Sequence, residues 1–288
     1  MQKVFLNGEF LPVKDANVSL LDRGFLYGDG VFETMRGYNG RVFMLDAHVD
    51  RLFGALDILK IKTSFGKKDV AQAVTKTVSV NRLKSAYVKV IVTRGAGPMG
   101  MGIAHSGKPT CACLATPLGT IKADTYKKGV SLGLSSARRN EKSFIAGIKS
   151  LNYLDNILAK EEARGTEYFD MVMLNSRGLV TETTSANIFM VKNGKVVTPP
   201  VSAGILPGVT RQAVIGIISA NAGNTVIEKD ISPDMLYASD EIFVTNSVLE
   251  IVPVVKLDRK MIGNGRPGPF SRTALAIYRK MAQSGREV

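Results

Sequence analysis

The sequence predicts an α+β protein with two domains, and three observations lead to this class. The 288 residues are 45% hydrophobic, which is enough apolar material for two cores of ordinary size. Strand patterns and helix patterns occur in both halves of the chain. They do not follow the regular strand-helix-strand alternation that is typical of a doubly wound sheet. We expect a smaller α+β domain at 1–118, an interdomain connection at 119–128 and a larger domain at 129–288.

The first half begins with an expected β-hairpin, because Asn7-Gly8 separates two apolar runs and suits a tight turn. A helix at 45–59 is predicted by apolar residues that recur at spacings of three and four. Pro98 to Pro109 is rich in glycine and proline and is expected to be a loop. The remaining expected elements are strands at 31–38, 86–93 and 111–115 and a helix at 68–80.

The second half contains more strands and a second hairpin turn at Asn193-Gly194. A helix is expected at 150–163, with Leu151, Leu154 and Leu158 as its apolar stripe and Gly165 at its end. The remaining expected elements are strands at 130–136, 169–174, 179–191, 241–245 and 251–257 and a helix at 211–221.

Composition limits the functional classes only in part. The net charge of +13 indicates an anionic partner, but the basic residues form no long run, so small phosphates or carboxylates suit it as well as nucleic acid. Cys111 and Cys113 would lie on the same face of a strand as small core residues, and their spacing does not predict a metal site. We expect a cytoplasmic protein, since no apolar run is long enough for a membrane helix and the start does not resemble a signal peptide.

Two glycine-rich segments match nucleotide-binding motifs but lack a feature that each motif requires. Gly95 to Gly100 fits the G-x-G-x-x-G pattern of dinucleotide sites, but Pro98 prevents the helix whose amides would meet a pyrophosphate. The segment 102–109 imitates a phosphate loop, yet Pro109 stands where serine or threonine is required. We interpret both as one loop that could border an active site.

Three segments offer candidate chemistry, each with an ordinary alternative. Lys149 precedes an apolar stripe, where desolvation would make its amine a better nucleophile, although spacing alone favours a surface lysine. Glu182 lies among short polar residues between two apolar strands. It is either an ordinary charge at the end of a strand or a carboxylate that pairs with a pyridinium nitrogen. The segment 204–211 runs into a helix whose amides could hold a phosphate or simply begin the helix.

Together these segments resemble the class IV aminotransferases, a fold type IV family that includes branched-chain aminotransferases, D-amino-acid aminotransferases and 4-amino-4-deoxychorismate lyases. Six motifs occur in the family's order and cover nearly the whole chain, and six ordered motifs are far more specific than any one alone. They lie at 27–36, 48–52, 149–156, 181–189, 206–211 and 245–253.

The resemblance implies pyridoxal 5'-phosphate as cofactor and a two-domain fold with the cofactor bound mainly by the larger domain. Lys149 would form the Schiff base, and Glu182 would pair with the pyridine nitrogen. The other implied cofactor contacts are Arg51, Val209, Thr210 and Ser247 at the phosphate, Tyr153 at the phenolic oxygen and Leu206 at the ring. The implied substrate residues are Tyr27, Phe32, Arg36, Tyr87 and Lys89. The family also implies a homodimer.

Differences between this sequence and the motifs of each subfamily narrow the range of possible substrates. Met99-Gly-Met101 stands where D-amino-acid enzymes have an Arg-x-His pair. Lys89 stands where branched-chain enzymes typically have arginine, which keeps the charge but loses the bidentate fork. Asn246-Ser-Val248 resembles the deoxychorismate lyases. We therefore expect an aminotransferase acting on a branched-chain-like amino acid and a 2-oxo acid, with the lyase as the alternative and the D-amino-acid enzyme behind both.

Overall fold

The structure is a computed structural model that describes residues 2–104, 106–221 and 225–285. It consists of two compact units, each with its own sheet. Of the described residues, the first unit contains 2–119 together with 148–152, and the second contains 120–147 and 153–285. The short return of the chain at 148–152 is the feature that positions Lys149.

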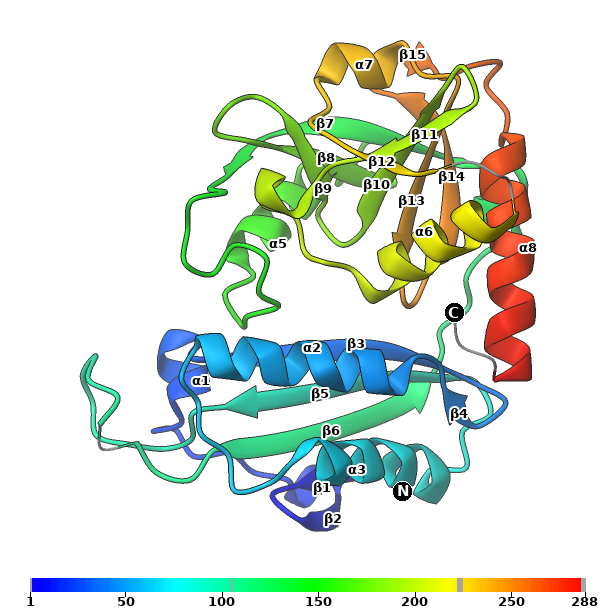
Figure 1. The fold of residues 1–288 in the computed structure, drawn as a ribbon. Coiled ribbons are helices and arrows are strands. Elements are labelled where there is room, and N and C mark those ends of the chain that lie inside the picture. The colour runs from blue at the N-terminus through cyan, green and yellow to red at the C-terminus, as the bar shows by residue number, and fades with distance from the viewer. Residues whose placement is uncertain (1, 105, 222–224, 286–288) are drawn as a thin grey trace. The chain divides into compact units, whose positions relative to one another are not determined.

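The first unit is an antiparallel sheet with helices on one face (Figure 1). Its strand order is β2-β1-β6-β5-β3-β4. The strands are β1 (Lys3–Leu6), β2 (Glu9–Pro12), β3 (Gly30–Tyr38), β4 (Arg41–Val42), β5 (Ala86–Thr93) and β6 (Thr110–Pro117). The helices are α1 (Arg23–Tyr27), α2 (Leu45–Ile58) and α3 (Lys67–Val80), with a 3₁₀ turn at Val13–Asp15. The expected first hairpin is confirmed, with Asn7 and Gly8 both at positive φ.

Strand alternation gives this sheet two chemically different faces. On β5, Val88, Val90 and Val92 are buried in the core that α2 and α3 cover. Cys111 and Cys113 belong to the same core, as their spacing predicts. Tyr87 and Lys89 alternate with the valines and therefore point to the opposite face. Tyr87 and Lys89, two of the residues expected to meet the substrate, thus lie on the face away from the two helices.

The segment 148–152 runs along the edge of β3. Phe32 donates its backbone N–H to the carbonyl of Lys149, and Leu151 donates to Gly30, both at 2.9 Å. Ser150 and Val31 form the intervening antiparallel bridge. The expectation of a helix from residue 150 is therefore wrong at its start, because these backbone groups pair with β3 instead of within a helix. The expected domain ranges assign this segment to the second domain, whereas its hydrogen bonds join it to the first unit's sheet.

The second unit is built on a mixed sheet with the order β12-β11-β10-β13-β14-β7-β8-β9, and β15 pairs with β14. Pairing is parallel between β14 and β7, β7 and β8, and β11 and β12. Its strands are β7 (Val130–Arg139), β8 (Asp170–Asn175), β9 (Val180–Thr183), β10 (Asn187–Lys192), β11 (Lys195–Thr198), β12 (Ile227–Glu228), β13 (Glu241–Asn246), β14 (Glu250–Leu257) and β15 (Lys260–Met261). The expected strand at 179–191 is interrupted by a turn at 184–186, which separates β9 from β10.

The helices of the second unit are short apart from α6 and α8. They are α4 (Ala123–Lys127), α5 (Leu154–Glu161), α6 (Val209–Asn221), α7 (Pro233–Tyr237) and α8 (Pro269–Ser284), with a 3₁₀ turn at Val201–Ala203. Helices α6 and α8 pack beside β13 and β14 (Figure 1). Within the described residues, no helix is long and apolar enough to cross a membrane.

The predicted apolar stripe of α5 is wrong for two of its three leucines. Leu154 and Leu158 are 69% and 63% exposed, and Ile157 is 58% exposed. The buried side chains of α5 are instead Asn156 and Ala159, because Asn156 donates to the carbonyl of Thr184 at 2.7 Å. An apolar helix face is therefore left exposed in this chain.

Asp22 joins three segments of the first unit. Its carboxylate, 1% exposed, accepts hydrogen bonds from the N–H of Gly24, at the start of α1, and from the hydroxyls of Thr93 and Thr110. One carboxylate thereby fixes α1 to the ends of β5 and β6.

We expect Asp22→Ala to lower the free energy of unfolding by about 3 kcal/mol, because the helix loses its cap and two hydroxyls lose a buried acceptor. Urea denaturation followed by circular dichroism measures this loss. Asp15→Ala, at an exposed position, is the matched control. A loss below about 0.5 kcal/mol would contradict the structural role given to Asp22.

Candidate active site

The candidate residues are divided between the two units, and each half of the site is described by itself. In the first unit, the amine of Lys149 lies 4.5 Å from the ring centroid of Phe32, on β3. The amine of Lys89, on β5, also lies 4.5 Å from this centroid. The fold therefore brings together two lysine amines and one aromatic ring that are far apart in the chain.

Burial and the charge of Lys149 both lower the pKa of Lys89 below its usual value. Two ammonium groups near one ring repel each other, and a nearby anion would relieve that repulsion. This corner of the first unit is suited to a carboxylate ligand.

The other substrate candidates on the sheet share the face of Phe32 and Lys89. Thr34 is paired with Lys89 and Arg36 with Tyr87 across the antiparallel strands, so these side chains project from one surface. The guanidinium of Arg36 lies 4.6 Å from the ring centroid of Tyr38. The face combines aromatic rings with two cations.

Tyr27, the last residue of α1, contacts the loop that follows β5. Its hydroxyl accepts a hydrogen bond from the N–H of Gly100 at 2.9 Å. Arg23 donates to the carbonyl of Gly100 at 2.8 Å and lies 4.9 Å from the ring centroid of Tyr27. The expected loop at 98–109 is therefore tied to α1 near its glycines.

Arg51 is held in a buried cluster that the sequence did not reveal. Its Nε and Nη2 both donate to the carboxylate of Glu33 at 2.7 Å, and Nδ1 of His48 lies 2.7 Å from the same carboxylate. Burial alone would raise the pKa of Glu33, but the charge of Arg51 and the hydrogen bonds from His48 and Arg51 lower it to about 2. Because an ionised carboxylate only accepts, Nδ1 of His48 carries the proton.

Burial lowers the pKa of His48, against the opposing influence of Glu33. His48 is therefore expected to be neutral at pH 7. The cluster holds the guanidinium of Arg51 in one orientation through two bonds to a single carboxylate.

We expect Glu33 to contribute stability that depends on pH. Its pKa is lower in the folded chain than in the unfolded chain, so its contribution is complete above about pH 4.5 and is lost as the pH falls towards 2, by about 3 kcal/mol in total. The stability difference between the unmodified chain and Glu33→Gln should shrink over that window in urea titrations. Glu9→Gln, at an exposed position, should show no such change. A difference that stays constant from pH 6 to 3 would contradict the shift.

In the second unit, Glu182 on β9 receives three donors. They are a guanidinium nitrogen of Arg139, the amide nitrogen of Asn187 at 2.7 Å and the backbone N–H of Leu206 at 3.1 Å. Glu182 is 5% exposed, and these donors fix the orientation of its carboxylate. Arg139, at the end of β7, was missed in the sequence because nothing in its neighbourhood points to a partner 43 residues away.

Gly208 is required by the close approach of the chain to Asn187. A Cβ atom at this position would lie 1.9 Å from the side-chain oxygen of Asn187. Any larger residue would displace the amide that holds Glu182. The requirement for glycine at position 208 of the 206–211 motif is therefore steric.

The start of α6 provides the elements of an anion site. Val209 and Thr210 are its first two residues and are buried, and the Thr210 hydroxyl lies 3.3 Å from the hydroxyl of Ser247. A helix start presents unpaired N–H groups and a positive dipole end. The buried Thr245 hydroxyl, on the strand position opposite Asn187, has no hydrogen-bond partner within the described residues.

These features fit a group that carries both an anion and a ring nitrogen. The hydroxyls and helix start suit a phosphate, and the oriented carboxylate of Glu182 suits a protonated nitrogen. Leu206 lies between these features in the chain, and Tyr153 precedes α5. The second unit therefore holds an oriented carboxylate and a helix start with two hydroxyls, whereas Arg51, also expected at the phosphate, belongs to the first unit.

The loop that carries Ser247 is fixed from two sides. Asn246 accepts hydrogen bonds from the N–H groups of Val248 and Leu249 through its side-chain oxygen. Glu250 is fully buried with a φ of 63°, and it accepts from Nε of Arg279 on α8 at 2.7 Å. The guanidinium of Arg279 lies 4.3 Å from the ring centroid of Tyr126. A strained residue and a buried ion pair therefore position the Ser247 hydroxyl.

Comparison with known proteins identifies the relatives of this arrangement. The family model described as amino-transferase class IV matches residues 30–257. A Methanocaldococcus jannaschii protein named "Putative branched-chain-amino-acid aminotransferase" is 40% identical over 94% of this chain and 93% of its own length. The aminodeoxychorismate lyase of Bacillus subtilis is 33% identical over 96% of this chain and 94% of its own length.

Solved structures show the same fold. The branched-chain aminotransferase of Escherichia coli superimposes with a TM-score of 0.92 at 29% identity, covering 99% of this chain and 96% of that one. Two further branched-chain aminotransferase structures, both 28% identical with TM-scores of 0.93 and 0.92, contain pyridoxamine 5'-phosphate and N-(5'-phosphopyridoxyl)-L-glutamate. Each covers 99% of this chain and 95% of its own.

Proposed function

Because this chain belongs to the class IV aminotransferase family, whose cofactor is pyridoxal 5'-phosphate, we propose that it transfers an amino group between a branched-chain-like amino acid and a 2-oxo acid. One observation carries the proposal, namely the amines of Lys149 and Lys89 beside the ring of Phe32. An amine for covalent chemistry thus lies next to an apolar surface and a cation for a carboxylate.

Each residue has a separate role in the proposal. When bound, the cofactor supplies a carbonyl for the amino group and a ring that accepts an electron pair. Lys149 would hold the cofactor and move the proton of the substrate carbon, and Glu182, oriented by Arg139 and Asn187, would pair with the ring nitrogen. The other proposed cofactor contacts are Arg51, Val209, Thr210 and Ser247 at the phosphate, Tyr153 at the phenolic oxygen and Leu206 at the ring.

The substrate side supports an apolar amino acid. Phe32 and Tyr87 offer aromatic surface, and Arg36 and Lys89 offer positive charge, on the same face of the sheet. Tyr27 would join them from α1. An apolar side chain would contact the rings while its carboxylate meets a cation.

We expect borohydride reduction of the purified protein to fix the cofactor on Lys149, since a covalent bond to its amine is the core of the proposal. Peptide mapping by mass spectrometry locates the modified residue. Lys89 is the internal control, because its amine lies at the same distance from Phe32. A label on Lys89 or any other residue, or protein that binds no pyridoxal phosphate, would overturn the proposed function.

The second candidate is 4-amino-4-deoxychorismate lyase, which the Bacillus subtilis relative and Lys89 in place of arginine favour. Both reactions begin with proton removal at the substrate carbon. They differ in whether the proton is returned to the cofactor or pyruvate leaves the ring substrate.

We expect branched-chain L-amino acids, given without an acceptor, to release their 2-oxo acids and leave pyridoxamine 5'-phosphate, and 2-oxoglutarate to reverse this. Chromatography of the extracted cofactor measures the conversion. D-Alanine and D-glutamate are the matched controls and should convert slowly, since Met99 and Met101 replace the Arg-x-His pair. If no amino acid converts the cofactor while aminodeoxychorismate yields pyruvate and 4-aminobenzoate, the lyase function is correct instead.

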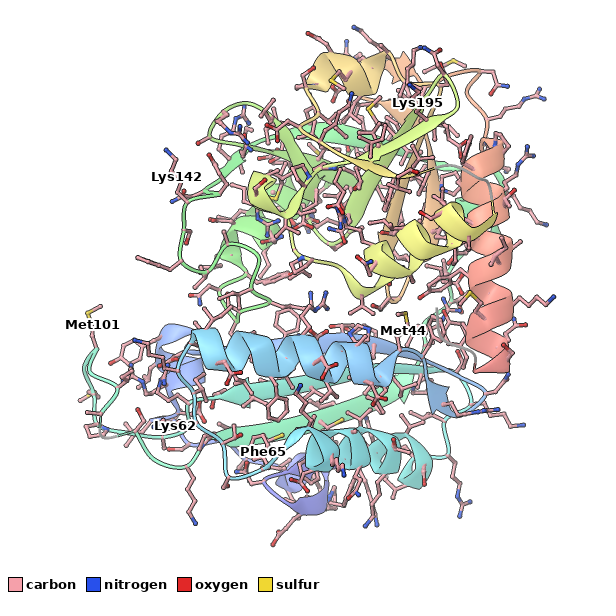
Figure 2. The ribbon with its side chains drawn as sticks, viewed as in Figure 1. Met44, Lys62, Phe65, Met101, Lys142 and Lys195 are labelled. Carbon is pink, nitrogen blue, oxygen red and sulfur yellow. The ribbon has the colours of Figure 1, made fainter. Side chains whose placement is uncertain are left out.

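We further propose a homodimer, working in the cytoplasm, where its two free thiols would stay reduced. Two exposed apolar surfaces support the dimer. One includes Phe25 of α1 and Met99 and Met101 of the adjoining loop, and Figure 2 shows Met101 projecting from that loop. The other is the face of α5 that carries Leu154 and Leu158.

We expect Leu154→Asp combined with Leu158→Asp to convert the dimer to a monomer, because charged groups would replace the apolar surface of an interface. Sedimentation equilibrium measures the mass. Asp155→Asn, on the same helix, is the control and should leave the mass unchanged. A monomeric unmodified chain would refute the dimer outright, and a variant that stays dimeric would refute the role of α5.

A further inference from the structure

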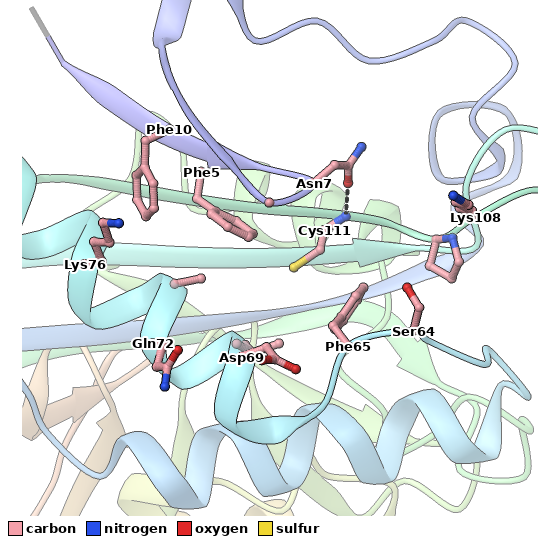
Figure 3. A pocket seen from close by; sticks show the side chains of 14 residues that line it. Phe5, Asn7, Phe10, Ser64, Phe65, Asp69, Gln72, Lys76, Lys108 and Cys111 are labelled. Carbon is pink, nitrogen blue, oxygen red and sulfur yellow. Dashed lines mark hydrogen bonds between the residues drawn. The ribbon is translucent and has the colours of Figure 1, made fainter.

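A cavity of about 680 Å³ lies entirely within the first unit. Figure 3 shows it between α3 with the preceding segment on one side and the β1–β2 hairpin with residues 108–111 on the other. Its volume is in the range of cavities that bind small organic molecules. None of the residues proposed for the cofactor or the substrate lines it.

The cavity is on the opposite face of the sheet from the substrate candidates. Cys111 at its base is paired with Val92 of β5, and Phe5 with Cys113, which in turn is paired with Val90. These side chains belong to the helix-covered face, whereas Lys89 and Phe32 project from the other. A ligand here would therefore occupy a site separate from the reaction.

Aromatic rings form much of the cavity wall. Phe5 and Phe10 face each other across the hairpin with ring centroids 5.4 Å apart at 61°, and Phe65 lies on the α3 side. Burial raises the pKa of the Cys111 thiol to about 12, so this group contributes a small apolar surface rather than a nucleophile. The wall suits a flat apolar ring.

Positive charge borders these rings. The amine of Lys76 lies 4.9 Å from the ring centroid of Phe10, and Lys108 lies at the other end of the cavity in Figure 3. The carboxylate of Asp69 also lines the cavity, but it already accepts the N–H of Gly66 at 2.7 Å as the cap of α3. Two lysines and one capping carboxylate therefore line the cavity, on a chain with a net charge of +13.

We propose that this cavity binds a small aromatic carboxylate, with its ring among Phe5, Phe10 and Phe65 and its carboxylate at Lys76, beside the ring of Phe10. The ligand's negative charge complements the two ammonium groups, and its ring matches the wall. Binding at this place does not depend on the proposed catalytic function.

The chain contains no tryptophan, so a single introduced tryptophan reports on this cavity alone. Gln72→Trp places the indole on the lining, and Ser79→Trp places it on the same helix outside the lining. We expect 2-naphthoate to quench the fluorescence of the Gln72→Trp variant with a Kd of about 1 mM or tighter, and to leave that of the Ser79→Trp variant unaffected. The neutral 2-naphthamide, which has the same shape, should bind at least tenfold more weakly.

Calorimetric titration of 2-naphthoate into the chain without tryptophan gives an independent measurement. Lys76→Glu should weaken binding at least tenfold, whereas Lys68→Glu, with the same charge change on the same helix but not among the lining residues, should not. The proposal is overturned if 2-naphthoate does not bind, if the amide binds equally well, or if the two lysine variants behave alike. Labelling of Lys149 by borohydride is unaffected by any of these outcomes, so the two proposals fail separately.

Discussion

The backbone pairing of residues 148–152 with the edge of β3 is the constraint on which the rest of the proposed site depends. It uses the carbonyl of Lys149 and the N–H of Leu151 as sheet partners, so the backbone around the lysine cannot rotate. A side chain on such a segment has only its own rotamers left to choose from. Hydrogen bonds of the backbone therefore hold the Lys149 segment next to β3, and the amine lies 4.5 Å from the ring centroid of Phe32.

Within each unit, buried carboxylates orient cations. Glu33 takes both donors of Arg51, Glu182 is joined by Arg139, and Glu250 by Arg279. A buried ion pair gains little net stability because desolvation costs about as much as the attraction returns. Its consequence here is directional, since two hydrogen bonds to a carboxylate hold a guanidinium in one plane. Lys89 is different, because the contact that orients it is an aromatic ring.

Short sequence patterns correctly predicted the elements that are stabilised by residues close to them in the chain. The Asn-Gly turns, the helix at α2 and the shared face of Cys111 and Cys113 depend on neighbours a few residues apart. The predicted start of the helix at residue 150 is wrong because residues near Ser150 pair with a strand more than a hundred positions earlier in the chain. Helix α8 was missed although Pro269 begins it and Gly285 ends it, which are ordinary helix signals. Glu33 and Arg139 were missed because their partners are distant in the sequence.

In the proposed function, the choice between transamination and elimination falls to the substrate residues of the first unit rather than to the residues that hold the cofactor. Glu182, Thr210 and Ser247 would serve either reaction, because both need the same ring and the same phosphate. Substrates differ in what they present to the sheet face of Phe32 and Lys89. The ammonium of lysine can contact a carboxylate from many directions, whereas the guanidinium of arginine donates hydrogen bonds to both carboxylate oxygens in one fixed geometry. In that proposal, lysine at position 89 relaxes the geometry required of the substrate carboxylate, and the aromatic surface beside it, rather than the cation, would discriminate between an alkyl side chain and a ring.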